Sequence, residues 1–210
     1  MQQPVTIRNL GLVSYADSLA EMQRFTEARN ATTRDEIWLL EHPPVFTLGT
    51  NADAAHILNA GSTAVVHTDR GGQVTWHGPG QLVVYVLMDI GRAKLGVRSL
   101  VCRLEQAIIA TLADFGIQAN GRDGAPGVYC GDTKIASVGL RIRRNCSYHG
   151  VAINVSNDLS PYTGINPCGY AGMAVTRTCD RGGPQTVAEL AQGLLPNLLN
   201  NLNLELADQP

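Results

Sequence analysis

The segment Leu82 to Met88 is apolar at all seven positions. Successive side chains of a β-strand point to opposite faces of the sheet, so a strand that is apolar on both parities must be covered on both faces. The run is also far too short to span a bilayer. We therefore expect a central strand in a sheet that is covered by other elements on both sides, in a protein without a membrane-spanning segment.

Helical patterns supply the covering elements. The clearest runs from Ser99 to Phe115 and ends before Gly116. Its apolar side chains recur at three- and four-residue steps, namely Val101, Leu104, Ile108, Leu112 and Phe115. We expect a second helix over Ser14 to Arg29, capped by Ser14 with Asp17, and a third over Thr186 to Leu195. Thr186 and Glu189 form a capping box for the third helix, and Pro196 should end or kink it.

Short extended runs outnumber the helices, and the two kinds occur in mixed order. The predicted strands are Glu36 to Leu40, Val45 to Leu48, Ala64 to Thr68, a hairpin over Gly127 to Arg144 that turns at Gly131-Asp132, and His149 to Ser156. The chain has 210 residues, 44% of them hydrophobic, and no internal repeat or linker. These features predict one domain over residues 1–210, of the α/β (α+β) class.

Charge and cysteine usage exclude several classes of function. The net charge of −2 gives no global basic field, so we expect no nucleic-acid partner. The first residues lack a basic segment followed by an apolar run, so we expect no signal peptide and a cytoplasmic location. The number of cysteines, five, is odd, so we expect no disulfides. No pair has C-x-x-C spacing, so we also expect no structural zinc site.

Lys134 is a candidate acid/base residue. In the second strand of the predicted hairpin it shares its parity with Ala136, Val138 and Leu140, whereas the arginines of this strand, Arg141 and Arg143, lie on the other face. A lysine on an apolar face is desolvated, and burial lowers a lysine pKa by up to ~3–5 units in extreme cases. The alternative is a lysine at the strand end whose amine reaches water.

Cys168 differs in context from the other cysteines. It lies in Asn166-Pro167-Cys168-Gly169-Tyr170, where the glycine lets backbone N–H groups approach a bound carbonyl. A thiol there could act as a nucleophile once a nearby cation lowers its pKa. The alternative is a free thiol in a turn.

The stretch Arg70 to Gln81 is rich in glycine but matches neither nucleotide-binding glycine pattern. Its backbone amides could line a ligand pocket, and His77 could orient a substrate or a thiolate; an ordinary hairpin loop is the alternative. His149 shares its parity with Val151 and Ile153, so we expect a buried core histidine whose hydrogen bonds are satisfied.

Several stretches in this order resemble the lipoate-biosynthesis octanoyltransferases, a family with the biotin/lipoate protein ligase fold. They are Arg70 to Gln81, Gly131 to Arg144, His149 to Val155, Asp158-Leu159 and Asn166 to Gly169. The resemblance implies a mixed β-sheet with flanking helices and a small second sheet. It also implies an acyltransferase of EC class 2.3.1 that takes an octanoyl group from acyl carrier protein. The acceptors would be lysines of lipoyl domains, in 2-oxoacid dehydrogenase E2 subunits and the glycine cleavage H protein.

The resemblance also implies roles for individual residues. Cys168 would be the acyl-thioester nucleophile and Lys134 its acid/base partner. The substrate-binding residues would be Arg70, Gly71, Gly72, Gln73, Val74, Thr75, Trp76, His77, Ser137, Val138, Gly139, Gly150, Val151 and Ala152. We expect no cofactor, no metal, no membrane partner and a monomer.

Three other functions compete with this one. An ATP-dependent lipoate or biotin ligase of the same fold would need no cysteine. A cysteine hydrolase would use water in place of the acceptor lysine, and a non-catalytic acyl-binding module would need neither Cys168 nor Lys134. Arg141, Arg143 and Arg144 form either a docking patch for acidic partner proteins or an ordinary solvated strand face.

Overall fold

Strand β6 (Gln81–Leu87) lies inside a seven-stranded sheet and is buried along its whole length in the computed structural model. Alternate side chains enter two separate cores. One core contains Leu82, Val84 and Val86, and the other contains Val83, Tyr85 and Leu87. The prediction of a strand that is covered on both faces is therefore confirmed. The structure describes residues 2–167 and 172–207.

The seven-stranded sheet has the order β10-β1-β2-β6-β9-β8-β7. Strand β1 runs parallel to β2 and β10, and the other neighbours are antiparallel, so the sheet is mixed. Its other strands are β1 (Gln3–Leu12), β2 (Asp35–Glu41), β7 (Gly127–Cys130), β8 (Thr133–Arg143), β9 (Cys146–Asn154) and β10 (Leu204–Leu206).

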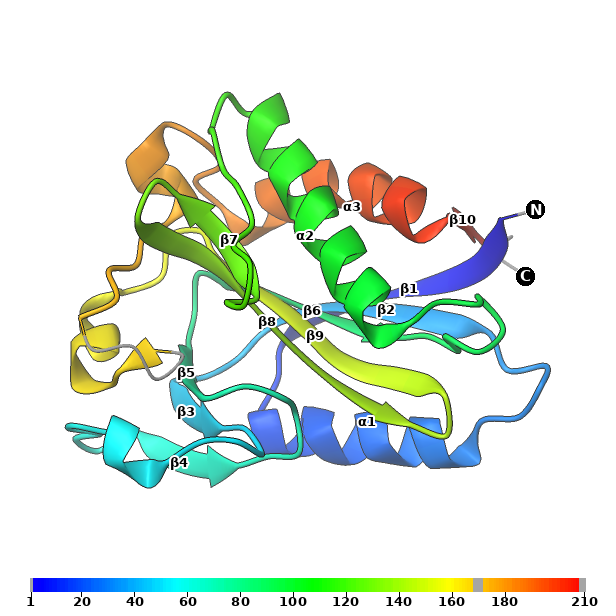
Figure 1. Cartoon of the computed structure of the whole chain (residues 1–210), viewed down its shortest axis with the longest axis horizontal. Coiled ribbons are helices and arrows are strands. Elements are labelled where there is room, and N and C mark those ends of the chain that lie inside the picture. The colour runs from blue at the N-terminus through cyan, green and yellow to red at the C-terminus, as the bar shows by residue number, and fades with distance from the viewer. Residues whose placement is uncertain (1, 168–171, 208–210) are drawn as a thin grey trace.

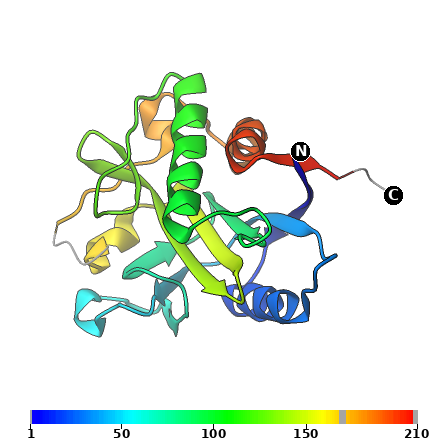
Figure 2. The same cartoon turned by 45° about the vertical axis from the view of Figure 1, so that its right-hand side comes forward.

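Helices cover both faces of this sheet. Helix α1 (Tyr15–Ala28) lies on one face, and α2 (Val97–Asp114) and α3 (Val187–Leu202) lie together on the other (Figures 1 and 2). The buried stripe of α2 includes Leu104, Ile108 and Leu112, as the spacing predicts. Within the described residues, no helix combines the length and the apolarity that a membrane span requires.

The helix ends follow their capping signals with one exception. The side chain of Ser14 accepts a hydrogen bond from the backbone N–H of Asp17. The side chain of Thr186 accepts one from the backbone N–H of Glu189. The expected end of the third helix at Leu195 is wrong, because α3 continues through Pro196 to Leu202. Buried Leu198 and Leu202 extend its apolar stripe, and their packing outweighs the local penalty of the proline.

A smaller three-stranded sheet has the order β4-β3-β5 and lies beside the large one (Figure 1). It consists of β3 (Val45–Leu48), β4 (Ala64–His67) and β5 (Val74–His77). Phe46, Leu48, Val74 and Trp76 form its core with residues from η2 (Ser160–Gly164) and the segment after it. Two other short helices that lie wholly within the described residues are η1 (Ala54–His56) and η4 (Thr178–Arg181).

The predicted hairpin turns at Gly131-Asp132 as expected, with Gly131 at φ 59°. A register shift between Val128 and Tyr129 places an extra residue in β8 opposite β7. Strand β9 begins at Cys146 rather than at His149, because Arg144 and Asn145 make a tight turn with positive φ and pairing resumes at once. The sequence analysis did not predict strands β1 and β10.

Candidate active site

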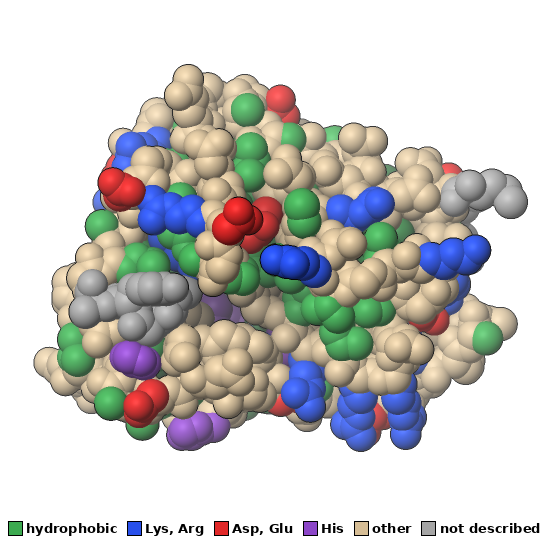
Figure 3. Space-filling view, in the orientation of Figure 1, with side chains coloured by type: hydrophobic (Ala, Val, Ile, Leu, Met, Phe, Trp, Pro, Cys, Tyr) green, Lys and Arg blue, Asp and Glu red, His purple; other side chains and the backbone are tan. Residues whose placement is uncertain are grey.

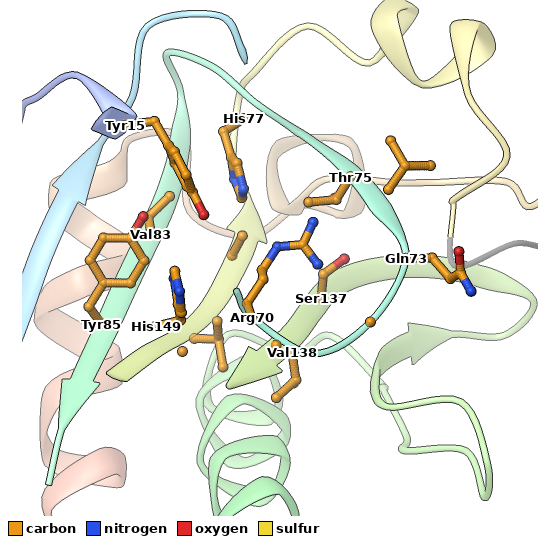
Figure 4. Close-up of a pocket in the computed structure, with 16 residues that line it drawn as sticks. Tyr15, Arg70, Gln73, Thr75, His77, Val83, Tyr85, Ser137, Val138 and His149 are labelled. Carbon is orange, nitrogen blue, oxygen red and sulfur yellow. The ribbon is translucent and has the colours of Figure 1, made fainter. Parts of the chain in front are cut away.

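A pocket between the two sheets collects most of the residues that the sequence predicts to bind substrate (Figure 4). Its lining comes from the stretch before and within β5, from β8 and from β9, and every predicted binding residue except Gly71 and Trp76 contributes to it. The full lining is Tyr15, Arg70, Gly72, Gln73, Val74, Thr75, His77, Val83, Tyr85, Ser137, Val138, Gly139, His149, Gly150, Val151 and Ala152.

Two glycines let the backbones approach one another in the pocket wall. Gly139 and Gly150 lie opposite each other on β8 and β9. A Cβ atom on Gly150 would lie 2.1 Å from the carbonyl oxygen of Val84, and one on Gly139 would lie 3.1 Å from that of Gly71. Gly71 itself donates its N–H to Leu140 at 2.8 Å, which fixes the glycine-rich stretch against β8.

Arg70 brings a positive charge into the pocket. Its side chain is almost fully buried, with 8% of the residue exposed. Nη2 donates to the carbonyl oxygen of Thr47 at 2.7 Å and to its hydroxyl at 2.8 Å, and Nη1 donates to the carbonyl oxygen of Gly71 at 3.0 Å. The guanidinium therefore ties β3 to the glycine-rich stretch and holds the pocket wall in place.

Trp76 lies outside the lining, in the core of the small sheet. Its ring packs against Tyr162 with centroids 6.0 Å apart. A Cβ atom on Gly78 would lie 2.1 Å from the indole, so the following glycine makes room for the ring. The structure therefore gives Trp76 a packing role in the small sheet.

Tyr15 and Tyr85 line one end of the pocket although neither was predicted to do so, and His42, outside the lining, packs against both rings. His42 Nδ1 donates a hydrogen bond to the carbonyl oxygen of Val13 at 2.6 Å. In the neutral ring Nε2 then carries no hydrogen, so it accepts a hydrogen bond from the hydroxyl of Tyr85 at 2.7 Å. The Tyr15 hydroxyl donates to Thr68 at 2.9 Å. The residues come from α1, β6 and the loop after β2, and no local pattern links them.

Burial keeps the buried histidine and tyrosine side chains near this end of the pocket neutral. Desolvation lowers the pKa of His42 to about 4 and that of His77 well below its usual value, and it raises the pKa of Tyr85 well above 10. His77 Nδ1 donates to the side-chain oxygen of Gln81 at 2.8 Å, which holds the imidazole in one orientation. At neutral pH these side chains are uncharged hydrogen-bonding groups.

His149 is buried as expected, with 1% of the residue exposed, but its hydrogen bonding differs from the expectation. Nε2 lies 2.9 Å from Oδ1 of Asp69, whereas Nδ1 has no partner among the described residues. The expected satisfied core histidine is therefore corrected to a histidine that is bonded on one side and lines the pocket.

Lys134 is buried, with 2% of the residue exposed, so the alternative of an exposed lysine at the strand end is wrong. Nζ donates to the carbonyl oxygen of Pro126 at 3.0 Å and lies 5.3 Å from the centre of the Tyr129 ring. A Cβ atom on Gly127 would lie 2.5 Å from Cε of Lys134, so this glycine provides the space for the lysine. Lys134 lies outside the lining of the pocket.

The predicted nucleophile, Cys168, lies outside the described residues. The segment that follows it in the chain is attached to Lys134. The backbone N–H of Lys134 donates to Ala174 at 2.9 Å, and its carbonyl oxygen accepts the N–H of Thr176 at 2.9 Å. Lys134 therefore pairs with a segment that starts six residues after Cys168 in the sequence.

Comparisons with known proteins agree with this architecture. The family model of the lipoyl protein ligase A/B catalytic domain matches residues 14–198. The octanoyltransferase of Laribacter hongkongensis is 56% identical over 196 residues, which cover 93% of this chain and 95% of that protein. The octanoyltransferase of Dechloromonas aromatica is 52% identical over 200 residues, which cover 95% and 98% of the two chains.

Solved structures share the fold at low sequence identity. A lipoate-protein ligase A bound with ATP superposes with a TM-score of 0.80 at 15% identity, covering 100% of this chain and 89% of the other. The biotin protein ligase of Aquifex aeolicus gives a TM-score of 0.57 at 13% identity, covering 96% and 69%. The predicted fold, a mixed sheet with flanking helices and a small second sheet, is confirmed.

Proposed function

Since the chain belongs to the octanoyltransferases of the lipoyl protein ligase A/B catalytic-domain family, which are acyltransferases, we propose a covalent mechanism for it. The enzyme transfers an octanoyl group through a thioester on Cys168. The donor is octanoyl-acyl carrier protein. The acceptors are lysines of lipoyl domains in 2-oxoacid dehydrogenase E2 subunits and in the glycine cleavage H protein. The enzyme acts as a monomer in the cytoplasm.

The burial of Lys134 is the observation that carries this proposal. Lys134 has 2% of its surface exposed and its Nζ donates to the Pro126 carbonyl, an environment that supports a chemical role for the amine. Its backbone bonds to Ala174 and Thr176 attach it to the segment that follows Cys168, which supports a pairing of the two side chains. A buried amine beside a thiol can take and return a proton.

The reaction proceeds in two acyl transfers. Lys134 takes the proton of the Cys168 thiol, and the thiolate attacks the thioester carbonyl of the donor. The bond from the acyl carbon to the carrier's sulfur breaks, and that sulfur receives the proton. The acceptor amine then loses a proton to Lys134 and attacks the acyl-enzyme, which releases the Cys168 thiolate and leaves an amide. The first exchange is nearly neutral in energy and the second runs downhill, so no ATP is consumed.

The pocket supplies the site for the acyl chain. Val83, Val138 and Val151 offer apolar side chains, and the glycines of β8 and β9 let a ligand approach the backbone. Backbone N–H groups of the glycine-rich stretches are the candidate oxyanion donors, and losing one such donor typically costs about 10²–10³ in rate.

The carrier and acceptor proteins would dock on a positively charged face. Lys and Arg side chains gather along the lower edge of the face in Figure 3, where Figure 1 places α1 and the end of the β8–β9 hairpin. Arg141 and Arg144 are exposed there, and Arg143 pairs with Glu27 at 2.8 Å. Charge complementarity with acidic partners would raise the rate of encounter.

Intact-protein mass spectrometry tests the proposal. The wild type is mixed with octanoyl-acyl carrier protein in the absence of ATP, beside Cys168→Ser and the control Cys179→Ser. We expect one octanoyl adduct on the wild type and the control, labile to hydroxylamine and discharged by a lipoyl domain, and no such adduct on Cys168→Ser. Modification of the lipoyl domain only with ATP and free octanoate would assign the chain to ligase chemistry. Steady release of octanoate without an acceptor would assign it to hydrolysis.

A further inference from the structure

One end of the acyl pocket holds a hydrogen-bond acceptor that the transfer chemistry leaves unused. The imidazole of His149 lies between the side chains of Tyr85 and Arg70 in Figure 4, and its ring centre is 6.0 Å from that of Tyr85. Nδ1 is buried and has no hydrogen-bond partner in the described parts of the chain. A buried acceptor without a donor is unfavourable, so a group that can satisfy it is favoured at this position.

Asp69 determines which nitrogen of His149 carries the hydrogen. Its Oδ1 lies 2.9 Å from Nε2, and a carboxylate only accepts hydrogen bonds, so Nε2 carries the hydrogen and Nδ1 presents a lone pair. Asp69 Oδ2 accepts from the hydroxyl of Tyr148 and, at 3.2 Å, from the amide of Gln23. These donors hold the carboxylate in place, and they lower its pKa. Burial lowers the pKa of His149, which keeps the imidazole neutral.

The backbone of His149 is held in a rare conformation. Its φ is 59°, in the left-handed region that non-glycine residues seldom occupy, although the residue lies inside β9. Such a conformation is strained and persists where the surroundings impose it, often at ligand sites. The neighbouring polar groups are already bonded, since the Tyr85 hydroxyl binds His42 and the Tyr15 hydroxyl binds Thr68.

His149 lies far from the reacting atoms along the sheet. It pairs with Leu140 of β8, and Lys134 lies six residues earlier in the same strand. A strand rises about 3.3 Å per residue, and the bulge takes up one of the six residues. The two positions are therefore roughly 17 Å apart. An acyl group attached near Lys134 would therefore present its far end, and not its carbonyl, to His149.

We propose that Nδ1 of His149, oriented by Asp69, is a distal acceptor site for acyl chains whose far end carries a hydroxyl group. A hydroxyl donates to Nδ1 and satisfies it, whereas a methyl end of the same length buries the acceptor without a donor. The same atom therefore limits the length of plain alkyl chains. This inference rests on the proposed function in one respect, that the pocket holds the acyl chain.

The variant Asp69→Asn reverses the polarity of the site with little change in shape. The amide oxygen takes the position that faces the two donors, Tyr148 and Gln23, so the amide nitrogen faces His149 and donates to Nε2. The hydrogen of the imidazole then moves to Nδ1, which becomes a donor. The exposed residue Asp123 provides the matched control, Asp123→Asn.

Nitrogen NMR of histidine-labelled protein, titrated with fatty acids, tests the proposal without requiring catalysis. Each ω-hydroxy acid is compared with the fatty acid of equal chain-atom number, such as 9-hydroxynonanoate with decanoate. We expect His149 to carry its hydrogen on Nε2 in the wild type and the control and on Nδ1 in Asp69→Asn. The hydroxy acid should shift the wild-type Nδ1 resonance. Its affinity relative to 8-methoxyoctanoate, an acid of the same chain-atom number whose ether oxygen only accepts, should fall at least about tenfold in Asp69→Asn.

The opposite outcome is distinct from a failure of the proposed function. If the affinity ratio is the same in the wild type and Asp69→Asn, and the Nδ1 resonance does not respond to any hydroxy acid, the distal acceptor site is wrong. The thioester on Cys168 is measured separately by mass, so loss of that adduct would overturn the transfer mechanism and leave this binding result intact.

Discussion

The environment of Lys134 shows how a single position acquires its chemistry from several neighbours. The register shift in β8 places Lys134 opposite Tyr129, so the parity that it shares with Ala136 in the sequence does not carry over to the sheet. Gly127 leaves the space that the lysine side chain occupies, and the Pro126 carbonyl accepts a hydrogen bond from Nζ. The Tyr129 ring, whose centre lies 5.3 Å from Nζ, packs beside the amine. These contacts hold the amine in one place, which a proton-transfer group requires.

Replacing Lys134 by methionine should separate folding from catalysis. Methionine keeps the unbranched stem and removes only the amine, so we expect the variant to fold with similar stability. The rate of octanoyl transfer should fall by about 10²–10⁴, the usual contribution of a general acid or base. Single-turnover acylation by octanoyl-acyl carrier protein measures this rate, and Lys94→Met, at the chain's other lysine, is the control. Equal rates for Lys134→Met and the wild type would remove Lys134 from the mechanism.

Helix α3 shows how packing overrides a local signal at the scale of an element. Pro196 lies inside the helix at an exposed position and lacks the N–H that would bond to the carbonyl of Gln192. The helix continues because Leu194, Leu198 and Leu202 bury one apolar stripe against the core. After Asn203 in the left-handed conformation, the chain enters β10 beside β1.

Replacing Pro196 by alanine should therefore stabilise the protein. Alanine restores the missing backbone hydrogen bond and has the highest helix propensity, and the exposed proline ring contributes little to the core. We expect the free energy of unfolding to rise by about 1–3 kcal/mol. Urea unfolding measures the change, and Gln192→Ala, at an exposed position of the same helix, should stay within about 0.5 kcal/mol of the wild type. A loss of stability in Pro196→Ala would show that α3 depends on the geometry that the proline imposes.

At the scale of the molecule, the two sheets enclose three buried histidines. His42 comes from the loop after β2, His77 from the small sheet and His149 from the large sheet. The ring centres of His42 and His77 are 5.7 Å apart. Burial lowers the pKa of all three, so the folded protein takes up these protons only at low pH.

The stability of the fold should therefore decrease in mild acid. The unfolded chain protonates its histidines near pH 6.5, whereas folded His42 stays neutral down to about pH 4. Between these values the unfolded state binds more protons, so the free energy of unfolding falls as the pH falls. His42 alone should contribute up to about 3 kcal/mol to this loss.

Denaturant unfolding between pH 7 and pH 4 checks this expectation with His42→Gln. Glutamine can donate to Val13 and accept from Tyr85 as the histidine does, but it does not titrate in this range. The variant should show a shallower dependence on pH than the wild type, and the exposed-histidine control His67→Gln should follow the wild type. Parallel curves for the wild type and His42→Gln would contradict a neutral buried His42.

Much of the fold could be predicted from local patterns. The all-apolar run of β6, the stripe of α2, the caps of α1 and α3 and the turn at Gly131 each depend on residues close in the sequence, and each appears as expected. Strands β1 and β10 escaped prediction because β1, which pairs with β2 and β10, lacks a strong alternation of buried and exposed residues, and the edge strand β10 has only three residues. Trp76 was predicted as a binding residue from its position in a motif, and its packing partners come from elsewhere in the chain.

By itself the sequence determined the order of the elements from the first helix to the third, the glycine-rich stretches and the candidate roles of Cys168 and Lys134. Only the tertiary structure decided that Lys134 is buried and that Tyr15, Asp69, Tyr85 and His149 meet at one end of the pocket. The reason is physical. Periodicity and capping report interactions within one element, whereas a pocket between two sheets is formed by segments as far apart as Asp69 and His149, whose contact depends on how the whole chain packs.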